Sequence, residues 1–196
     1  MTVHQDAHAS KPAGREQVVA SLLFATEQLC STRQPSSVTV REIASEAGVT
    51  TSLLYFYFAS KDDVIVATLR SVASEIDAAV ASAGGAREMA AEVGRLLIER
   101  PTFSRIIAWL ILEGRSVTEA MGDHAFMRRL MTAFAEYDAE DPQTRAGVVV
   151  TMLLANALFH GGVNVALGRS SDDERLIQAL DRVVALTSEH ATGRIP

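Results

Sequence analysis

The sequence contains a single cysteine, Cys30, and only five prolines. One cysteine excludes a disulfide within the chain, and Cys30 lies among apolar residues at helical spacing, which is typical of a small core residue and not of a reactive thiol. Scarce proline and abundant Ala, Leu, Val, Arg and Glu favour an all-α fold. Because no charged, apolar and small-residue leader opens the chain, we expect a cytoplasmic protein.

The chain also lacks an excess of basic residues, since its formal net charge is −6. Residues 1–70 hold six Lys/Arg and seven Asp/Glu, and the remainder holds twelve and seventeen. Neither part has an excess of basic residues. A nucleic acid could therefore be bound only by a few placed donors, and the acidic remainder would keep the rest of the chain away from phosphates.

The motifs of common enzymes are missing as well. No glycine-rich phosphate loop, two-histidine metal motif, or serine or cysteine nucleophile with suitable neighbours is found. His4 and His8 have no third ligand, so we expect neither a metal site nor a cofactor. These absences indicate a protein that is not an enzyme.

An uncharged stretch, residues 146–168, is long enough to span a bilayer. Three polar residues recur along it at every fourth position, namely Asn156, His160 and Asn164, and four glycines reduce its hydrophobicity. We therefore expect a helix buried in a soluble dimer and no membrane span.

The first part of the chain predicts a compact head of three helices. Apolar residues three and four positions apart predict a helix over residues 13–31. Thr39 and Glu42 form a capping box, which starts a second helix. Gly48 ends that helix, because glycine adopts the left-handed conformation that turns the chain. Thr50 then caps a third, two-turn helix.

A fourth helix, residues 61–82, is predicted after the cap at Ser60 and would link the head to the rest of the chain. Further helices are expected over residues 87–99, 102–113, 119–139, 142–167 and 172–189. About nine helices then divide into a flexible arm (1–12), a helix-turn-helix head (13–60) and a helical body (61–196).

Two short helices joined by a glycine-containing turn, with a third helix before them, form a helix-turn-helix arrangement. The second short helix of such a unit lies in the major groove of DNA. Between Val49 and Phe58 this helix has no Arg, Lys, Asn or Gln. Base recognition would therefore depend on apolar contacts, on DNA shape, and on Arg41 from the preceding helix.

The head resembles the N-terminal domain of the tetracycline-repressor (TetR) family. The resemblance rests on Val-Arg-Glu-Ile-Ala at 40–44, Ala-Gly-Val-Thr at 47–50 and Leu-Tyr-Phe-Tyr-Phe-Ala-Ser-Lys-Asp at 54–62. Beyond residue 70 it is architectural only. It implies a transcriptional repressor that binds a palindromic operator on double-stranded DNA as a homodimer, and that a small, largely apolar inducer releases.

The resemblance also implies which residues face DNA. Those expected at phosphates are Thr39, Thr50, Tyr55, Tyr57 and Lys61. Those expected at the groove are Arg41, Thr51, Ser52, Leu53 and Phe56. Arg41 is the best candidate for direct readout, because its guanidinium matches guanine. We expect Tyr55 to bury its ring and expose its hydroxyl, and Phe56 either to contact thymine methyl groups or to pack within the head.

In the body, the resemblance implies pairing through the two C-terminal helices and a ligand pocket. The residues predicted to line the pocket are Trp109, Met127, Met131, Met152 and Phe159, since aromatic and methionine side chains suit apolar ligands. Asn156 and His160 need hydrogen-bond partners on an otherwise apolar helix. They either serve the ligand or are satisfied across the dimer interface, and the sequence leaves both open.

A second function remains compatible with the uncharged third helix. The chain could be a dimeric small-molecule-binding protein whose head has weak or no operator affinity. A steep loss of DNA binding with salt would distinguish the two, because phosphate contacts release counterions.

Overall fold

The computed structural model describes residues 14–122, 125–135 and 141–166. Within these ranges all regular elements are helical, and the all-α prediction is confirmed. The α-helices are α1 (Arg15–Thr32), α2 (Val40–Glu46), α3 (Thr51–Tyr57), α4 (Lys61–Ala79), α5 (Ala86–Glu99), α6 (Pro101–Leu112), α7 (Val117–Met121), α8 (Ala125–Ala135) and α9 (Pro142–Ala166). Two 3₁₀ turns are η1 (Pro35–Ser37) and η2 (Val80–Ser82). The predicted arm (1–12) and last helix (172–189) lie outside the described residues.

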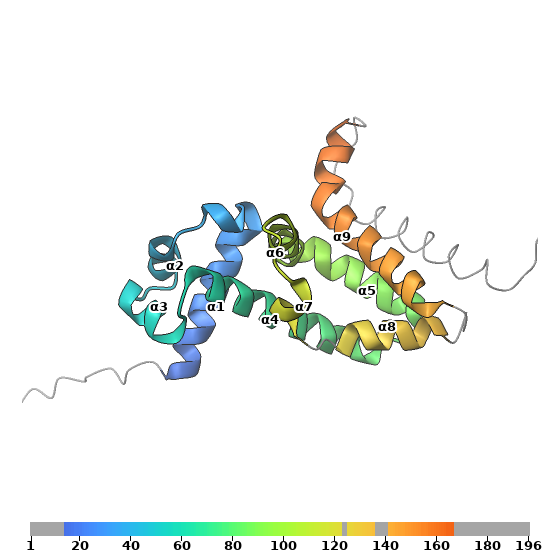
Figure 1. Cartoon of the computed structure of the whole chain (residues 1–196), viewed down its shortest axis with the longest axis horizontal. Coiled ribbons are helices and arrows are strands. Elements are labelled where there is room, and N and C mark those ends of the chain that lie inside the picture. Colours follow the sequence, from blue (N-terminus) through green and yellow to red (C-terminus); the bar gives the residue numbers. More distant parts are fainter. Residues whose placement is uncertain (1–13, 123–124, 136–140, 167–196) are drawn as a thin grey trace, which may run out of the picture.

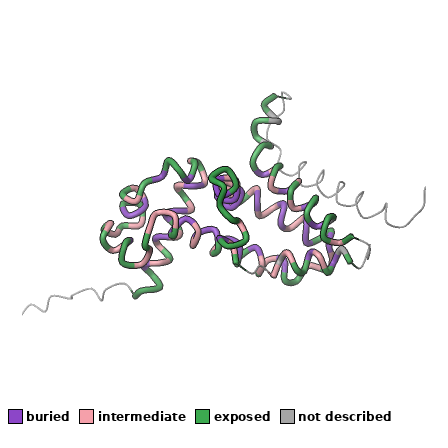
Figure 2. The backbone as a smooth tube through the Cα atoms, in the orientation of Figure 1, coloured by how far each residue is buried: buried purple, intermediate pink, exposed green. Residues whose placement is uncertain are grey.

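Helices α1 to α3 form a head at one end of the molecule, α5 to α9 form a body, and α4 runs from one to the other (Figure 1). Each part has its own core, as the buried segments in Figure 2 show. The head core comprises Val18, Leu22, Cys30, Val38, Ile43, Ala44, Leu54 and Val64. The body core begins with the next residue of α4, Ile65, and reaches Ala157 on α9.

Cys30 has no exposed surface. Burial raises the pKa of its thiol to about 11, so little thiolate forms near neutral pH. The prediction that Cys30 is a core residue is confirmed.

The head helices begin and end where local signals predict. The Thr39 hydroxyl accepts the Glu42 amide at 3.3 Å, and the Glu42 carboxylate accepts the Thr39 amide at 2.8 Å, which completes the capping box of α2. Gly48 has φ of 67°, and the amides of Gly48 and Val49 donate back to the last turn of α2. The Ser60 hydroxyl accepts the Asp63 amide at 3.1 Å and caps α4.

The single helix predicted over residues 119–139 is wrong. Two helices, α7 and α8, occupy this stretch. The break follows from Gly122, whose φ of 76° ends α7, while its amide donates to Thr118 O at 2.8 Å. The apolar spacing continues past this glycine, so periodicity did not reveal the break.

Ion pairs join the head to the body. Arg100, between α5 and α6, donates through Nε and Nη2 to the carboxylate of Glu27 on α1, with an Nη2–Oε2 distance of 2.8 Å. Its Nη1 also donates to Glu75 on α4. Arg115, after α6, pairs with Asp62 in the first turn of α4 at 2.9 Å. The head is therefore held against the body by side chains on α1 and on α4.

Helix α9 packs its first half on the body, and its last turns extend away from it (Figure 1). Phe159 and Val165 in this second half are 64% and 78% exposed. In the part of the chain that the structure describes, no helix has the length and apolar character needed to cross a membrane.

Candidate nucleic-acid interface and body cavity

Helix α3 has one outward face and one inward face. Leu54 is fully buried in the head core, and Tyr57 packs against that core. Ser52, Tyr55 and Phe56 are exposed. Tyr55 and Phe56 follow Ser52 by three and four residues, so each shares a face of the helix with Ser52. In helix-turn-helix proteins the second short helix lies in the major groove, and its outward face meets the bases.

Two threonine hydroxyls lie at the starts of the short helices, and their hydrogen bonds differ. The Thr50 hydroxyl accepts the Leu53 amide at 3.2 Å, which leaves its own proton for an acceptor outside the protein. The Thr39 hydroxyl donates to Glu42 Oε2 at 2.7 Å, so its proton is already used. Of these two exposed residues, Thr50 is the better placed to donate to a phosphate.

Glu42 is the acidic residue closest to these groups in sequence, and Arg33 neutralises it. The Arg33 guanidinium binds Glu42 Oε1 at 2.6 Å and the Ser37 carbonyl at 2.7 Å. Arg33, and then Thr39, hold the pKa of the Glu42 carboxyl at about 2, well below its usual range. The pair joins the end of α1 to α2 and lowers the negative charge beside the outward face.

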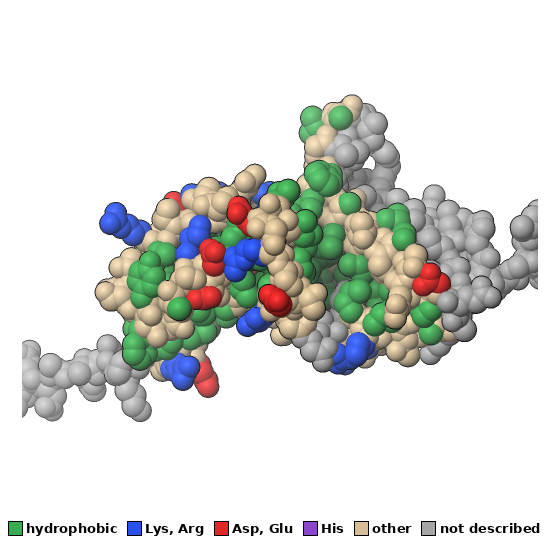
Figure 3. Space-filling model, in the orientation of Figure 1, with side chains coloured by type: hydrophobic (Ala, Val, Ile, Leu, Met, Phe, Trp, Pro, Cys, Tyr) green, Lys and Arg blue, Asp and Glu red, His purple; other side chains and the backbone are tan. Residues whose placement is uncertain are grey.

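The two basic residues predicted to meet DNA are arranged differently. Arg41 is exposed, and the described residues offer it no ion pair. Lys61 is half-buried, and its Nζ donates to the carbonyls of Pro35 and Ser36 at 3.2 Å each. An ammonium has three protons, so one remains for a phosphate. On the face shown in Figure 3, Lys and Arg side chains are scattered and do not form one basic patch.

The structure corrects the expected burial of Tyr55. Tyr55 is 56% exposed, so the prediction that its ring is buried is wrong. Tyr57 is half-buried and packs against the head core. Leu53 also packs against this core, and Thr51 is half-buried. Of the residues predicted at the groove, the outward face brings together Ser52 and Phe56.

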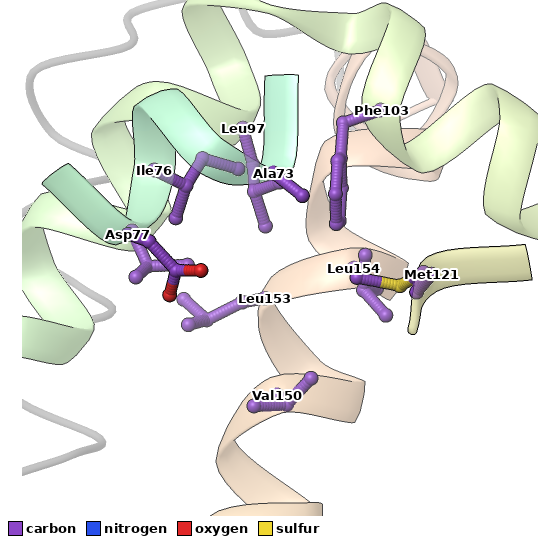
Figure 4. Close-up of a pocket in the computed structure, with 10 residues that line it drawn as sticks. Ala73, Ile76, Asp77, Leu97, Phe103, Met121, Val150, Leu153 and Leu154 are labelled. Atoms are coloured by element: carbon purple, nitrogen blue, oxygen red, sulfur yellow. The ribbon is translucent and has the colours of Figure 1, made fainter. Parts of the chain in front are cut away.

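The body contains a narrow, partly open cavity of about 30 Å³. In Figure 4 its side chains come from α4, α5, α6, α7 and α9 and surround one space. They are Ala73, Ile76, Asp77, Val93, Leu97, Phe103, Met121, Val150, Leu153 and Leu154. Asp77 is the one charged residue among these ten, so the lining is largely apolar. The volume is far below the roughly 300–1,000 Å³ of ligand pockets, so the cavity would have to widen to admit a ligand.

Of the residues predicted to bind a ligand, none whose side chain the structure describes lines this cavity. Trp109 is buried in the body core, with the Arg115 guanidinium 5.0 Å from its ring centroid. Met131 packs against the body core, Met127, Met152 and Asn156 are half-buried, and Phe159 is exposed. The side chain of His160 lies outside the description. Phe103 and Met121 carried no sequence signal that separated them from ordinary core residues.

The described residues do not bring three or more His, Cys, Asp or Glu side chains together as a group that could hold a metal ion. The two chemically distinctive places are therefore the outward face of α3, with the threonine and basic side chains around it, and the apolar cavity beside α4.

Known proteins share both the sequence of the head and the fold. Residues 22–68 match the family described as "Bacterial regulatory proteins, tetR family". A helix-turn-helix-type transcriptional repressor of Mycobacterium tuberculosis is 25% identical over 147 residues, which cover 75% of this chain and 71% of that protein. The helix-turn-helix-type transcriptional regulator BetI of Brucella suis is 34% identical over 95 residues, 45% of this chain and 48% of BetI.

Solved structures extend the similarity to the body. A transcriptional regulator from Streptomyces coelicolor superposes with a TM-score of 0.66 at 17% identity, covering 89% of this chain and 98% of that one. The fatty acid degradation regulator FadR from Bacillus halodurans superposes with a TM-score of 0.63 at 15% identity, covering 89% and 96%. At these identities the similarity shows the fold.

Proposed function

We propose that this transcriptional regulator, a member of the tetR family of bacterial regulatory proteins, is a repressor. It binds a palindromic operator as a homodimer, and a small, largely apolar ligand releases it. A bacterial repressor meets its operator in the cytoplasm, so we expect this chain there.

The outward face of α3 is the observation that carries this proposal. It is exposed, it belongs to a helix-turn-helix unit, and hydrogen-bond donors for phosphates precede and follow α3 in the chain, at Thr50 and Lys61. Thr50, Tyr55, Tyr57 and Lys61 are the proposed phosphate contacts, since hydroxyls and an ammonium position a protein on DNA without reading its sequence. Arg41 is proposed to reach a base edge or a phosphate.

An apolar stripe on α9 supports the proposed dimer. Val148 and Phe159 are 46% and 64% exposed, and Met152 and Asn156 are half-buried on the same side of the helix. Two copies of this stripe could pack against each other about a twofold axis. The stripe faces away from the cavity, which favours the dimer interface over the ligand for Asn156.

Helix α4 is the proposed link between ligand and DNA. Val64 lies in the head core and Ile65 in the body core, while Ala73 and Ile76 line the cavity two to three turns further along. A displacement of α4 by a ligand would thus reach the head. The ligand releases DNA only to the extent that it binds the displaced state more tightly than the DNA-binding state.

The test is binding of the purified chain to DNA from beside its own gene over a series of salt concentrations. The test variant combines Arg41→Gln with Tyr55→Phe, both at exposed positions, so folding should be retained. Its matched control is Arg87→Gln, at an exposed arginine of the body. We expect the double variant to weaken binding by about tenfold or more, because charge-assisted hydrogen bonds contribute roughly 1.5–3 kcal/mol.

Wild-type binding should become steeply weaker with salt, with a slope of roughly 0.9 per phosphate contact. A footprint with dyad symmetry, retained by Arg87→Gln, would support the repressor. A folded dimer that binds no DNA at low salt would overturn the proposed repressor function. It would favour the second function, a dimeric small-molecule-binding protein whose head has no operator affinity.

A further inference from the structure

Phe56 is the most exposed large apolar residue of the head, with 77% of its surface accessible. It lies on the outward face of α3, one turn after Ser52 and beside Tyr55. We propose that Phe56 recognises the 5-methyl group of thymine in the major groove and so determines which operator the protein selects. This inference rests on the proposed function, because it requires a head that binds DNA.

Packing does not account for Phe56. The head core and the residues packed against it include Leu53, Leu54, Tyr57 and Phe58 from this segment, but not Phe56. Its one ring contact among the described residues is with Tyr57, at a centroid distance of 5.1 Å and an interplanar angle of 90°. That edge-to-face contact restrains the Phe56 ring while its surface stays open to solvent.

The chemistry of α3 leaves few other ways to read bases. From Thr51 to Tyr57 the helix has no charged or amide side chain, so it cannot form the bidentate contacts that recognise guanine or adenine. In the major groove the thymine methyl is the apolar feature of the base edges, and phenylalanine is among the side chains that contact it. A restrained, exposed ring on the reading face matches that group.

Each half-site should therefore contain a thymine whose methyl group touches Phe56. Removing the methyl group, by replacing that thymine with deoxyuridine, leaves base pairing unchanged. The affinity should fall about fourfold for each half-site, which corresponds to the roughly 0.8 kcal/mol of burying one CH₂ group. Substitution in both half-sites should lower it about 15-fold if the two contributions add.

The experiment uses the full chain and a duplex that the chain itself selects from a randomised pool. Each thymine of the selected duplex is replaced in turn by deoxyuridine, and the affinity is measured for wild type and for Phe56→Ala. The control is Phe24→Ala, which removes a phenylalanine 62% exposed on α1, away from the reading face. Thermal unfolding verifies that both variants fold.

We expect one thymine in each half-site whose replacement weakens wild type and Phe24→Ala about fourfold and Phe56→Ala hardly at all. Specific binding without such a thymine, or with the same loss in Phe56→Ala, would overturn the inference and leave the proposed function intact. If the wild-type chain selects no duplex and shows no salt-sensitive binding, the proposed function fails, and the inference fails with it.

Discussion

Replacing Arg100 by glutamine should destabilise the junction between head and body. Arg100 holds Glu27 of α1 with two hydrogen bonds and Glu75 of α4 with a third. The Glu27 side chain is 14% exposed and the Glu75 side chain is 54% exposed. Arg100→Gln therefore leaves one carboxylate largely buried without its partner and another in solvent.

The magnitude follows from these exposures. Exposed pairs contribute roughly 0–1 kcal/mol, and breaking a fully buried pair costs roughly 3–5 kcal/mol. The Glu27 pair lies between these limits, so we expect Arg100→Gln to lower the free energy of unfolding by about 2 kcal/mol. A double-mutant cycle with Glu27→Gln and Arg100→Gln should assign most of this loss to the ion pair between these two residues.

Arg95 provides the matched control, because it also binds two carboxylates, Glu92 and Glu99, but within α5. These side chains are 30–52% exposed, so Arg95→Gln should cost about 0.5 kcal/mol. The assay is urea unfolding at one protein concentration, in 0.15 M and 1 M NaCl. Equal losses for the two variants, or a loss for Arg100→Gln that disappears in 1 M NaCl, would refute the reasoning, because salt screens exposed pairs far more than buried ones.

Four further substitutions test the head and the body. Arg33 lowers the pKa of Glu42, so the stabilisation from this ion pair is present above pH 4.5 and is lost as the pH falls to about 2. Glu42→Gln should therefore flatten a plot of the unfolding midpoint against pH between these values. A plot unchanged by the substitution would contradict this prediction. Gly48→Ala should lower the free energy of unfolding by about 1 kcal/mol, because Gly48 has a positive φ. Gly147→Ala, within helix α9, should raise it by about 0.5 kcal/mol. Thermal unfolding measures both changes, and changes of the same sign would be inconsistent with this argument. Leu153→Ala, at a buried cavity wall, should cost about 3 kcal/mol in urea unfolding, and a loss below about 1 kcal/mol would mean that the wall collapses.

The helix boundaries of the head were predictable because their causes are local. Thr39 and Glu42 satisfy each other three residues apart, and Ser60 caps α4 through the Asp63 amide at the same spacing. Gly48 acts through its own backbone. Such signals need no knowledge of the tertiary structure.

The orientation of α3 and the break after α7 could not be predicted correctly from the sequence. A seven-residue helix is too short for apolar spacing to fix which side faces inward, so the burial of the Tyr55 ring was predicted wrongly. At Gly122 two physical preferences competed. Apolar spacing favoured a continuous helix, but a glycine in the left-handed conformation ended α7.

Helix α9 shows why the cavity could not be found from sequence. It has two stripes on opposite sides, since residues recur every 3.6 positions: Val150, Leu153 and Leu154 line the cavity, and Met152 and Phe159 belong to the other side. Both stripes are largely apolar, so periodicity could not decide which one the body would bury. The choice depends on the helices around the cavity, since residues of α4, α5, α6 and α7 face the first stripe there. The second stripe remains open over much of its length, and its apolar surface is the physical reason to look for a second copy of the chain there.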